Sequence, residues 1–286
     1  MATQQPVNVT PGKVATEGDD LYYEMRGRGR PLLLIPGALG DAGIYTFVAE
    51  LLADEFRVIT YDRRGQSRST RNSPQNFEIS QQARDAVAVL HAAGEESAIV
   101  FGNSSGAIIA LEMARSAPAT VQALIAHEPP ALRVLPDADE WLALIADVYL
   151  TALTIGHAQA LAKFMGSIAI PPTPPDPELY GTPVFQQISN RQRANSSSEF
   201  AMRHEVLPSS RYLPDVAALR RSGVRIFMAI GEMTQEAGAY YGRTAPILAE
   251  QLGCELVVFP GHHGSYLVNP REWTATLRGI LHKIGR

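Results

Sequence analysis

A short glycine-flanked segment contains a serine whose surroundings favour nucleophilic chemistry. Residues 102–106 read GNSSG and fit the pattern G-x-S-x-G. An apolar segment, 98–101, precedes them, and a segment rich in Ala, Ile, Leu and Met follows them. A tight turn between a strand and a helix exposes the central serine and directs free helix N–H groups toward it. We therefore predict Ser104, rather than Ser105, as a nucleophile.

Two adjacent histidines are candidates for the base that such a serine needs. A serine hydroxyl becomes a good nucleophile when a base accepts its proton, and histidine does this near neutral pH. Of the seven histidines, His262 and His263 come directly after a predicted strand, 256–259. Position after the strand alone does not separate the two.

Three glutamates are candidates for the carboxylate that orients the histidine and stabilises its cation. Glu128 follows a predicted strand, 121–126, whereas Glu232 and Glu236 follow another. Ligand sites gather where parallel strands end, which favours Glu128. Pro129 disfavours a helix at Glu128, and we expect an extended backbone there. Glu232 stays open as the alternative.

Short apolar segments alternate with longer helical segments along most of the chain. The predicted strands are 21–25, 32–35, 56–61, 98–101, 121–126, 224–230 and 256–259. The predicted helices are 44–53, 79–93, 105–116, 244–252 and 270–284. Continuous apolar strands separated by helices predict an α/β fold with a doubly wound, mostly parallel sheet.

One region interrupts this alternation. Residues 129–213 show no convincing strand pattern. We expect helices over 140–164 and 184–206, separated by a proline-rich segment, 171–177, that fits neither a helix nor a central strand. The predicted organisation is a core formed by 1–128 and 214–286, with 129–213 inserted as a mainly helical cap.

Together these motifs resemble those of α/β-hydrolase fold enzymes over nearly the whole chain. The matching segments are LLLIPG at 32–37, YDRRGQSRS at 61–69, GNSSG at 102–106, and PGHH at 260–263 followed by Tyr266, Pro270 and Trp273. The resemblance implies the α/β-hydrolase fold with its inserted cap. The sequence departs from the family at Pro36, which replaces the usual His, and at Thr234, which replaces the usual acidic Asp.

The resemblance also implies roles for individual residues. The family's loop Pro-Gly-x-His, with an aromatic residue three positions later, selects His263 as the base and leaves His262 as the alternative. The catalytic-loop motifs resemble those of the zearalenone lactonase-like subgroup, in which the glutamate of His-Glu-x-Pro is the acid; here it is Glu128. Backbone N–H groups of Ser105 and, by resemblance, Ala38 would form the oxyanion hole.

Composition limits the classes of partner. The 286 residues include 25 basic and 29 acidic residues, so no basic excess exists to bind nucleic acid. One cysteine excludes an intrachain disulfide and a zinc site built on several thiolates. We see no Sec-type signal peptide and no membrane-spanning apolar segment, and expect a cytoplasmic protein. The sequence carries no signal for oligomeric state.

These observations predict a serine hydrolase that needs no metal or cofactor. Its substrate would be a carboxylic ester or lactone of a hydrophobic small molecule, cleaved through an acyl-enzyme. Two alternatives remain open. Carbon–carbon bond hydrolysis uses the same triad in relatives, and a non-catalytic binding protein would fit the missing acid at Thr234.

Overall fold

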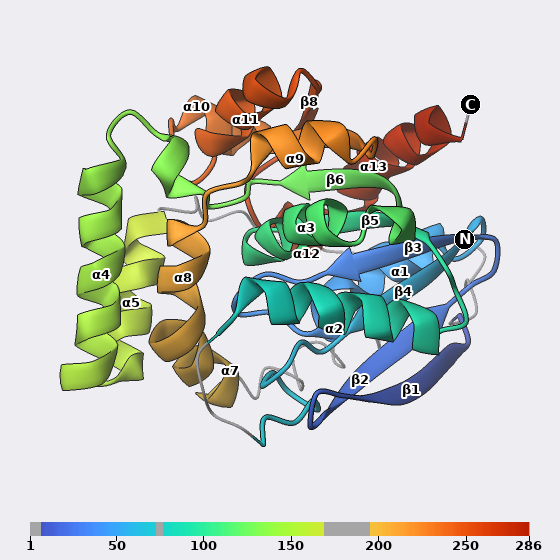
Figure 1. Cartoon of the computed structure of the whole chain (residues 1–286), viewed down its shortest axis with the longest axis horizontal. Helices are drawn as coiled ribbons and strands as arrows, with labels where there is room; N and C mark the ends of the chain where they lie inside the picture. Colours follow the sequence, from blue (N-terminus) through green and yellow to red (C-terminus); the bar gives the residue numbers. More distant parts are fainter. Residues whose placement is uncertain (1–6, 73–76, 169–194, 286) are drawn as a thin grey trace.

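An eight-stranded sheet forms the centre of the computed structural model, which describes residues 7–72, 77–168 and 195–285 (Figure 1). The strands are β1 (Val9–Thr16), β2 (Asp19–Arg26), β3 (Arg30–Ile35), β4 (Phe56–Tyr61), β5 (Ala98–Asn103), β6 (Val121–His127), β7 (Arg225–Gly231) and β8 (Glu255–Phe259). Their order in the sheet is β1-β2-β4-β3-β5-β6-β7-β8. The β1–β2 and β2–β4 pairs are antiparallel, and all later pairs are parallel. The predicted doubly wound, mostly parallel sheet is confirmed.

Alternate residues of each strand face opposite helical layers, as the two-residue period of a strand requires. In β3, Leu33 and Ile35 belong to one apolar cluster, whereas Leu32 and Leu34 belong to another. The first layer, in front of the sheet in Figure 1, contains α2 (Ile79–Ala92), α3 (Ser105–Ser116), α9 (Val216–Arg221) and α11 (Thr244–Leu252). The second contains α1 (Thr46–Leu52), α12 (Ser265–Val268) and α13 (Pro270–Ile284).

A group of helices is inserted between β6 and β7, at the end of the sheet toward which β3 and β6 point in Figure 1. Its described elements are α4 (Ala138–Thr154), α5 (His157–Ile168), α7 (Asn195–Phe200), a π-helical turn η4 (Ala201–Glu205) and α8 (Val206–Arg211). Residues of α4, α5, η4 and α8 form an apolar cluster that also includes Tyr240 and Tyr241. We therefore expect the functional site between this insertion and the carboxyl ends of the parallel strands.

The insertion differs in detail from the predicted helices. The expected continuous helix over 140–164 is two helices, because the chain breaks between α4 and α5 at Gly156, whose φ of 143° suits glycine alone. The proline-rich segment 171–177 and the first part of the predicted helix 184–206 lie outside the described residues. From 195 onward that segment is helical.

Strand β1 was missed by the sequence analysis. It pairs along its whole length with β2 at the edge of the sheet, and most of its residues are exposed or half-buried. An edge strand needs no continuous apolar run, and Pro11 and Gly12 weaken the strand pattern further.

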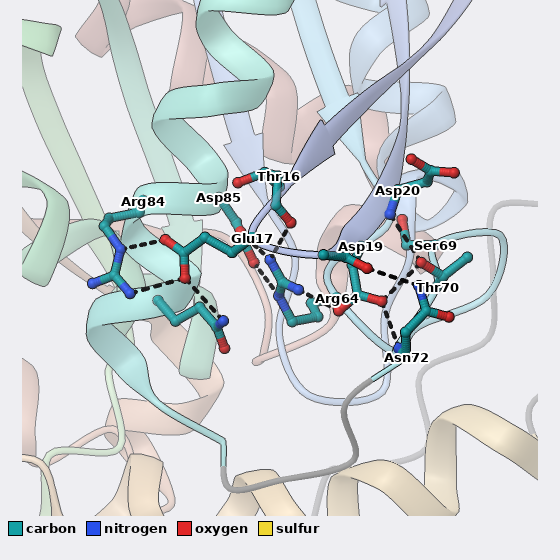
Figure 2. A network of polar contacts seen from close by, with 12 residues as sticks. Thr16, Glu17, Asp19, Asp20, Arg64, Ser69, Thr70, Asn72, Arg84 and Asp85 are labelled. Atoms are coloured by element: carbon teal, nitrogen blue, oxygen red, sulfur yellow. Dashed lines mark hydrogen bonds and ion pairs between the residues drawn. The ribbon is translucent and has the colours of Figure 1, made fainter.

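A buried arginine ties this edge to the loop that follows β4 (Figure 2). Arg64 donates two hydrogen bonds to Asp85 on α2, at 2.7 and 2.8 Å, and also pairs with Asp19 at the start of β2. Asp19 in turn accepts hydrogen bonds from the Thr70 hydroxyl at 2.9 Å and the Asn72 N–H at 2.6 Å. We call these five residues the Arg64 cluster. It fixes the loop 62–72 against the scaffold.

Within the described ranges, no helix combines the length and the apolar character needed to cross a membrane.

Candidate active site

Ser104 lies in a sharp turn between β5 and α3. Its backbone has φ 57° and ψ −127°, an unfavourable conformation for a residue with a side chain. The Ser104 N–H donates to the carbonyl of His127 at 2.9 Å, which holds the turn against β6. A Cβ on Gly102 would lie 2.3 Å from the Gly106 carbonyl oxygen, and a Cβ on Gly106 would lie 2.3 Å from that of Ile35. The glycines of the motif therefore permit close packing that no other residue allows.

Glu128 and His263 meet although 135 residues separate them. His263 Nδ1 lies 2.5 Å from Glu128 Oε2, and the other carboxylate oxygen accepts from the Gly231 N–H at 2.7 Å. The Glu128 side chain is fully buried, whereas His263 is 15% exposed. Burial alone raises the pKa of Glu128, but the neighbouring His127 and the bonds from His263 and Gly231 outweigh it and lower that pKa to about 2. A carboxylate is thus held ionised against one imidazole nitrogen.

The expected extended backbone at Glu128 is wrong. Its φ is 47°, in the left-handed region, although Pro129 follows it. Three bonds impose this conformation: the Glu128 N–H donates to the Ala229 carbonyl at 2.9 Å, and the two carboxylate oxygens bind Gly231 and His263. Such strain persists where the surrounding structure over-determines it, and it concentrates at functional sites.

The alternative candidates lie elsewhere. His262 is buried in the loop turn, where its N–H donates to Ser265 Oγ at 2.7 Å and its Nδ1 accepts from the Gly264 N–H at 3.1 Å. Burial lowers the pKa of His262. Glu232 and Glu236 are exposed on the short helix α10 (Glu232–Glu236). The structure brings Glu128, and neither of these two glutamates, to His263.

A second layer of polar groups lies behind this pair. Asn103 Nδ2 donates to His127 Nδ1 at 2.9 Å, and the Tyr266 hydroxyl donates to Asn103 Oδ1 at 3.3 Å. Burial lowers the pKa of His127 to about 4, helped by the neighbouring His263 and opposed by Glu128. His127 is therefore neutral at pH 7, with its proton on Nε2, because Nδ1 accepts the amide hydrogen.

In the described part of the chain, one group of imidazoles and carboxylates is close enough to share a metal ion. It consists of His127, Glu128 and His263, whose donor atoms lie within 4.8 Å of one another. The internal bonds already described use both Glu128 oxygens and one nitrogen of each histidine. These hydrogen bonds hold the Glu128 carboxylate and the two imidazoles in fixed orientations.

Ser104 and His263 line the same mostly apolar cavity beneath the insertion, which is the more enclosed of two cavities at Ser104. Its other walls are Ala38, Ser105, Pro130, Ile145, Phe164, Ile168, Val206, Ser209, Ser210, Tyr240 and Tyr241. A second, more open cavity of about 220 Å³ also reaches Ser104 and includes Leu39, Met165 and Leu267. Phe164 and Ile168 of α5 line both cavities. Both cavities therefore offer mostly apolar space next to Ser104.

The cap residues divide between the cavity walls and the cap's interior. Ile145, Phe164 and Met165 line a cavity, as do Tyr240 and Tyr241 from the core. Trp141 instead stacks on Tyr240, with ring centroids 4.5 Å apart and planes 12° apart. Trp141 and Leu142 pack in the apolar cluster of the cap and line neither cavity.

The two predicted oxyanion donors come from different elements. Ser105 is the first residue of α3, and Ala38 follows β3 in a turn closed by a hydrogen bond from Gly40 N–H to Gly37 O at 3.1 Å. Both residues line the enclosed cavity with Ser104. Beneath them lies a buried group that the sequence analysis missed: Glu205 of η4 bonds to Ser105 Oγ, and Arg63 pairs with Glu205. Arg63 stands inside the motif at 61–69, but no pattern marks Glu205, because its partners are about a hundred residues or more away.

Comparison with known proteins identifies the family. The model of the α/β-hydrolase fold family matches residues 30–153. The uncharacterized hydrolase YraK of Bacillus subtilis (strain 168) is 30% identical over 282 residues, which cover 97% of this chain and 98% of that protein. The chain belongs to the α/β-hydrolase family, and the predicted fold is confirmed.

Two further relatives lie at greater distance. The zearalenone hydrolase of Bionectria ochroleuca is 23% identical over 257 residues, which cover 87% of this chain and 89% of that protein. Among solved structures, a thermophilic esterase from Thermogutta terrifontis, solved with malate bound, superposes with a TM-score of 0.73. It is 23% identical, and the match covers 97% of this chain and all of that one. The structural likeness shows the shared fold.

Proposed function

We propose that this hydrolase is a serine hydrolase that cleaves a carboxylic ester or lactone of a hydrophobic small molecule. The observation that carries the proposal is the buried, ionised Glu128 bonded to His263, which lines the same cavity as Ser104. Ser104 would attack the carbonyl carbon while His263 accepts its proton, and Glu128 would stabilise the imidazolium. The N–H groups of Ala38 and Ser105 would receive the negative charge on the carbonyl oxygen.

The second half of the reaction needs no further group. His263 returns its proton to the leaving alcohol, and water activated by the same imidazole then releases the acyl group from Ser104. The apolar walls favour a hydrophobic substrate, and residues 129–213 would act as its cap over a core of 1–128 and 214–286. The relation to a zearalenone hydrolase and the His-Glu-x-Pro motif at 127–130 support a lactone as one member of this substrate class.

The direct test is hydrolysis of p-nitrophenyl acetate through octanoate and one aromatic macrolactone by the wild type and by Ser104→Ala. Loss of the nucleophile should lower kcat by at least about 10⁴-fold. Wild-type activity that survives in Ser104→Ala would contradict the proposal.

The choice of acid is tested by a matched pair of variants. Glu128→Gln removes the charge that holds His263 and should lower kcat by about 10³- to 10⁴-fold. Glu232→Gln alters an exposed glutamate and should leave kcat close to that of the wild type. Loss of turnover in Glu232→Gln alone would show that Glu128 is not the acid.

A further inference from the structure

A carboxylate from the cap reaches the first residue of the helix behind Ser104. Glu205, at the end of η4, is fully buried, and its Oε1 accepts a hydrogen bond from Ser105 Oγ at 2.6 Å. The same oxygen lies 2.7 Å from Arg63 Nη2, and the Arg63 side chain is also fully buried. Gln66 Nε2 donates to the other oxygen, Oε2, at 3.3 Å.

Two of the three core partners of Glu205, Arg63 and Gln66, also bond to the turn that follows β3. Arg63 Nη2 donates to the carbonyl of Gly37 at 2.8 Å, and Gln66 Nε2 donates to the carbonyl of Ala38 at 3.1 Å. The Glu205 carboxylate is therefore hydrogen-bonded directly to Ser105. It is linked to the Gly37–Ala38 turn through Arg63 and Gln66, which bond to both. These are the two segments whose N–H groups would bind the oxyanion.

The charges in this group are arranged so that they do not oppose the reaction. A carboxylate near the N-terminus of the twelve-residue helix α3 is favourably placed with respect to the helix dipole. A lone negative charge there would repel a developing oxyanion, and the Arg63 guanidinium balances it. Glu205 thus needs Arg63 for electrostatics as well as for burial.

Stability alone does not account for such a pair. A buried ion pair gains little over apolar side chains of similar volume, because both charges must lose their hydration. What this pair supplies instead is a fixed geometry between the cap, the loop after β4 and both oxyanion segments. The π-helical turn that presents Glu205 is a rare helix form that occurs often at functional sites.

We propose that Glu205 is a positioning residue that sets the spacing between the Ala38 and Ser105 N–H groups, so that docking of the cap completes the oxyanion hole. The inference rests on the proposed serine hydrolase function. Glu205 contacts neither the substrate nor the reacting atoms; it acts through Ser105, Arg63 and Gln66. The substrate would meet a complete oxyanion hole only when η4 is seated against the loop 62–72.

The test compares three variants of the full chain on the best p-nitrophenyl ester. Glu205→Gln should lower kcat by about 10- to 100-fold, because a small misplacement of transition-state donors is costly, while KM changes by less than about threefold. The double variant Arg63→Met/Glu205→Met removes both charges together. It should unfold at a temperature close to that of the wild type, yet keep the low kcat.

The control is another arginine–carboxylate pair between cap and core, which is half-buried rather than fully buried. Arg243 donates to both oxygens of Asp137, at 2.8 and 3.0 Å, away from the oxyanion segments. Asp137→Asn should keep the wild-type kcat. Wild-type kcat in Glu205→Gln, or recovery of kcat together with thermal stability in the double variant, would overturn the inference.

Hydrogen exchange separates a failure of this inference from a failure of the proposed function. Peptides that span 36–41 and 103–109 should exchange faster in Glu205→Gln than in the wild type, and unchanged exchange would contradict the inference. This readout needs no turnover, so it tests the positioning role even if Ser104→Ala proves that hydrolysis does not depend on Ser104.

Discussion

Arg63 and Arg64 are neighbours in sequence, yet they belong to two different regions of the molecule. Arg64 points to the edge of the sheet, where α2 and the β1–β2 hairpin supply its partners Asp85 and Asp19 (Figure 2). Arg63 is buried on the side of the loop that faces the cap, where its partners are Glu205 and the carbonyl of Gly37. Both side chains extend from the same loop, but Arg64 bonds to the edge of the sheet and Arg63 bonds to the cap and to the turn after β3.

The bonding of the two arginines differs as much as their direction. Arg64 makes a two-point contact with Asp85 and also bonds to Asp19 and the Thr16 carbonyl, which is the geometry of a strong structural anchor. Arg63 directs both of its bonds through Nη2, and its Nε and Nη1 have no hydrogen-bond partner among the described residues. We infer that the two arginines have different roles. Arg64 fixes the loop 62–72 to the scaffold, and Arg63 would align the proposed oxyanion hole with that loop.

Among the substitutions that test this comparison of the two arginines, Arg63→Met should have the largest effect. The substitution leaves the Glu205 carboxylate buried without its cation, which should lower the free energy of unfolding by about 3–5 kcal/mol. The uncompensated charge should also lower kcat of the folded enzyme by about 100-fold. Denaturant unfolding and steady-state kinetics measure the two effects separately. A variant that loses stability but keeps kcat would place Arg63 with the scaffold, beside Arg64.

Arg64→Met should lower the free energy of unfolding but leave kcat nearly unchanged. It leaves Asp85 buried and unpaired, and we expect a loss of about 3 kcal/mol in the free energy of unfolding. The kcat of the folded fraction should stay within about twofold of the wild type, because no Arg64 partner lines the cavity. A large drop in kcat would show that Arg64, like Arg63, supports the proposed oxyanion hole.

The cost of Arg64→Met should depend on pH. Burial raises the pKa of Asp85, and the bonds from Arg64 partly counter that rise. Without Arg64 the pKa rises further above its unfolded value, so the protonated form stabilises the fold at low pH and this contribution is lost as pH increases. Urea unfolding should therefore show a smaller penalty at pH 5 than at pH 7. The double variant Arg64→Met/Asp85→Asn is the control and should show no such change relative to the wild type; an equal penalty at both pH values in the single variant would contradict the argument.

The smallest effect is expected at the rim of the Arg64 cluster. Glu17 bonds to Arg84 at 2.5 Å, and this bond is the main reason why its pKa is lowered to about 2. Both side chains are well exposed, at 37% and 55%, so solvent screens the pair. Glu17→Gln should cost less than about 1 kcal/mol in thermal or urea unfolding and leave kcat unchanged. A larger cost would show that the cluster extends cooperatively to the surface.

The sequence predicts those parts of the molecule whose signal is local. Strands β3 and β5 are continuous apolar runs, and the glycines around Ser104 mark a tight turn, so the fold and the position of the candidate nucleophile in that turn follow from neighbouring residues. Gly156 also carried a local signal that the expected helix over 140–164 overlooked.

The rest depends on contacts between distant segments. The backbone of Glu128 is fixed by Ala229, Gly231 and His263, and no rule about the residue before proline anticipates φ 47°. Glu205 carries the pattern of an ordinary polar helix residue, and only the docking of η4 on the loop 62–72 reveals that it is buried.

The most direct test of the central claim, that Ser104 is an activated nucleophile, is covalent labelling with a fluorophosphonate followed by peptide mass spectrometry. We predict rapid addition of one label on the peptide containing Ser104, much slower labelling in Glu128→Gln, and none in Ser104→Ala. Absence of labelling in the wild type, or a label on any other residue, would contradict the account.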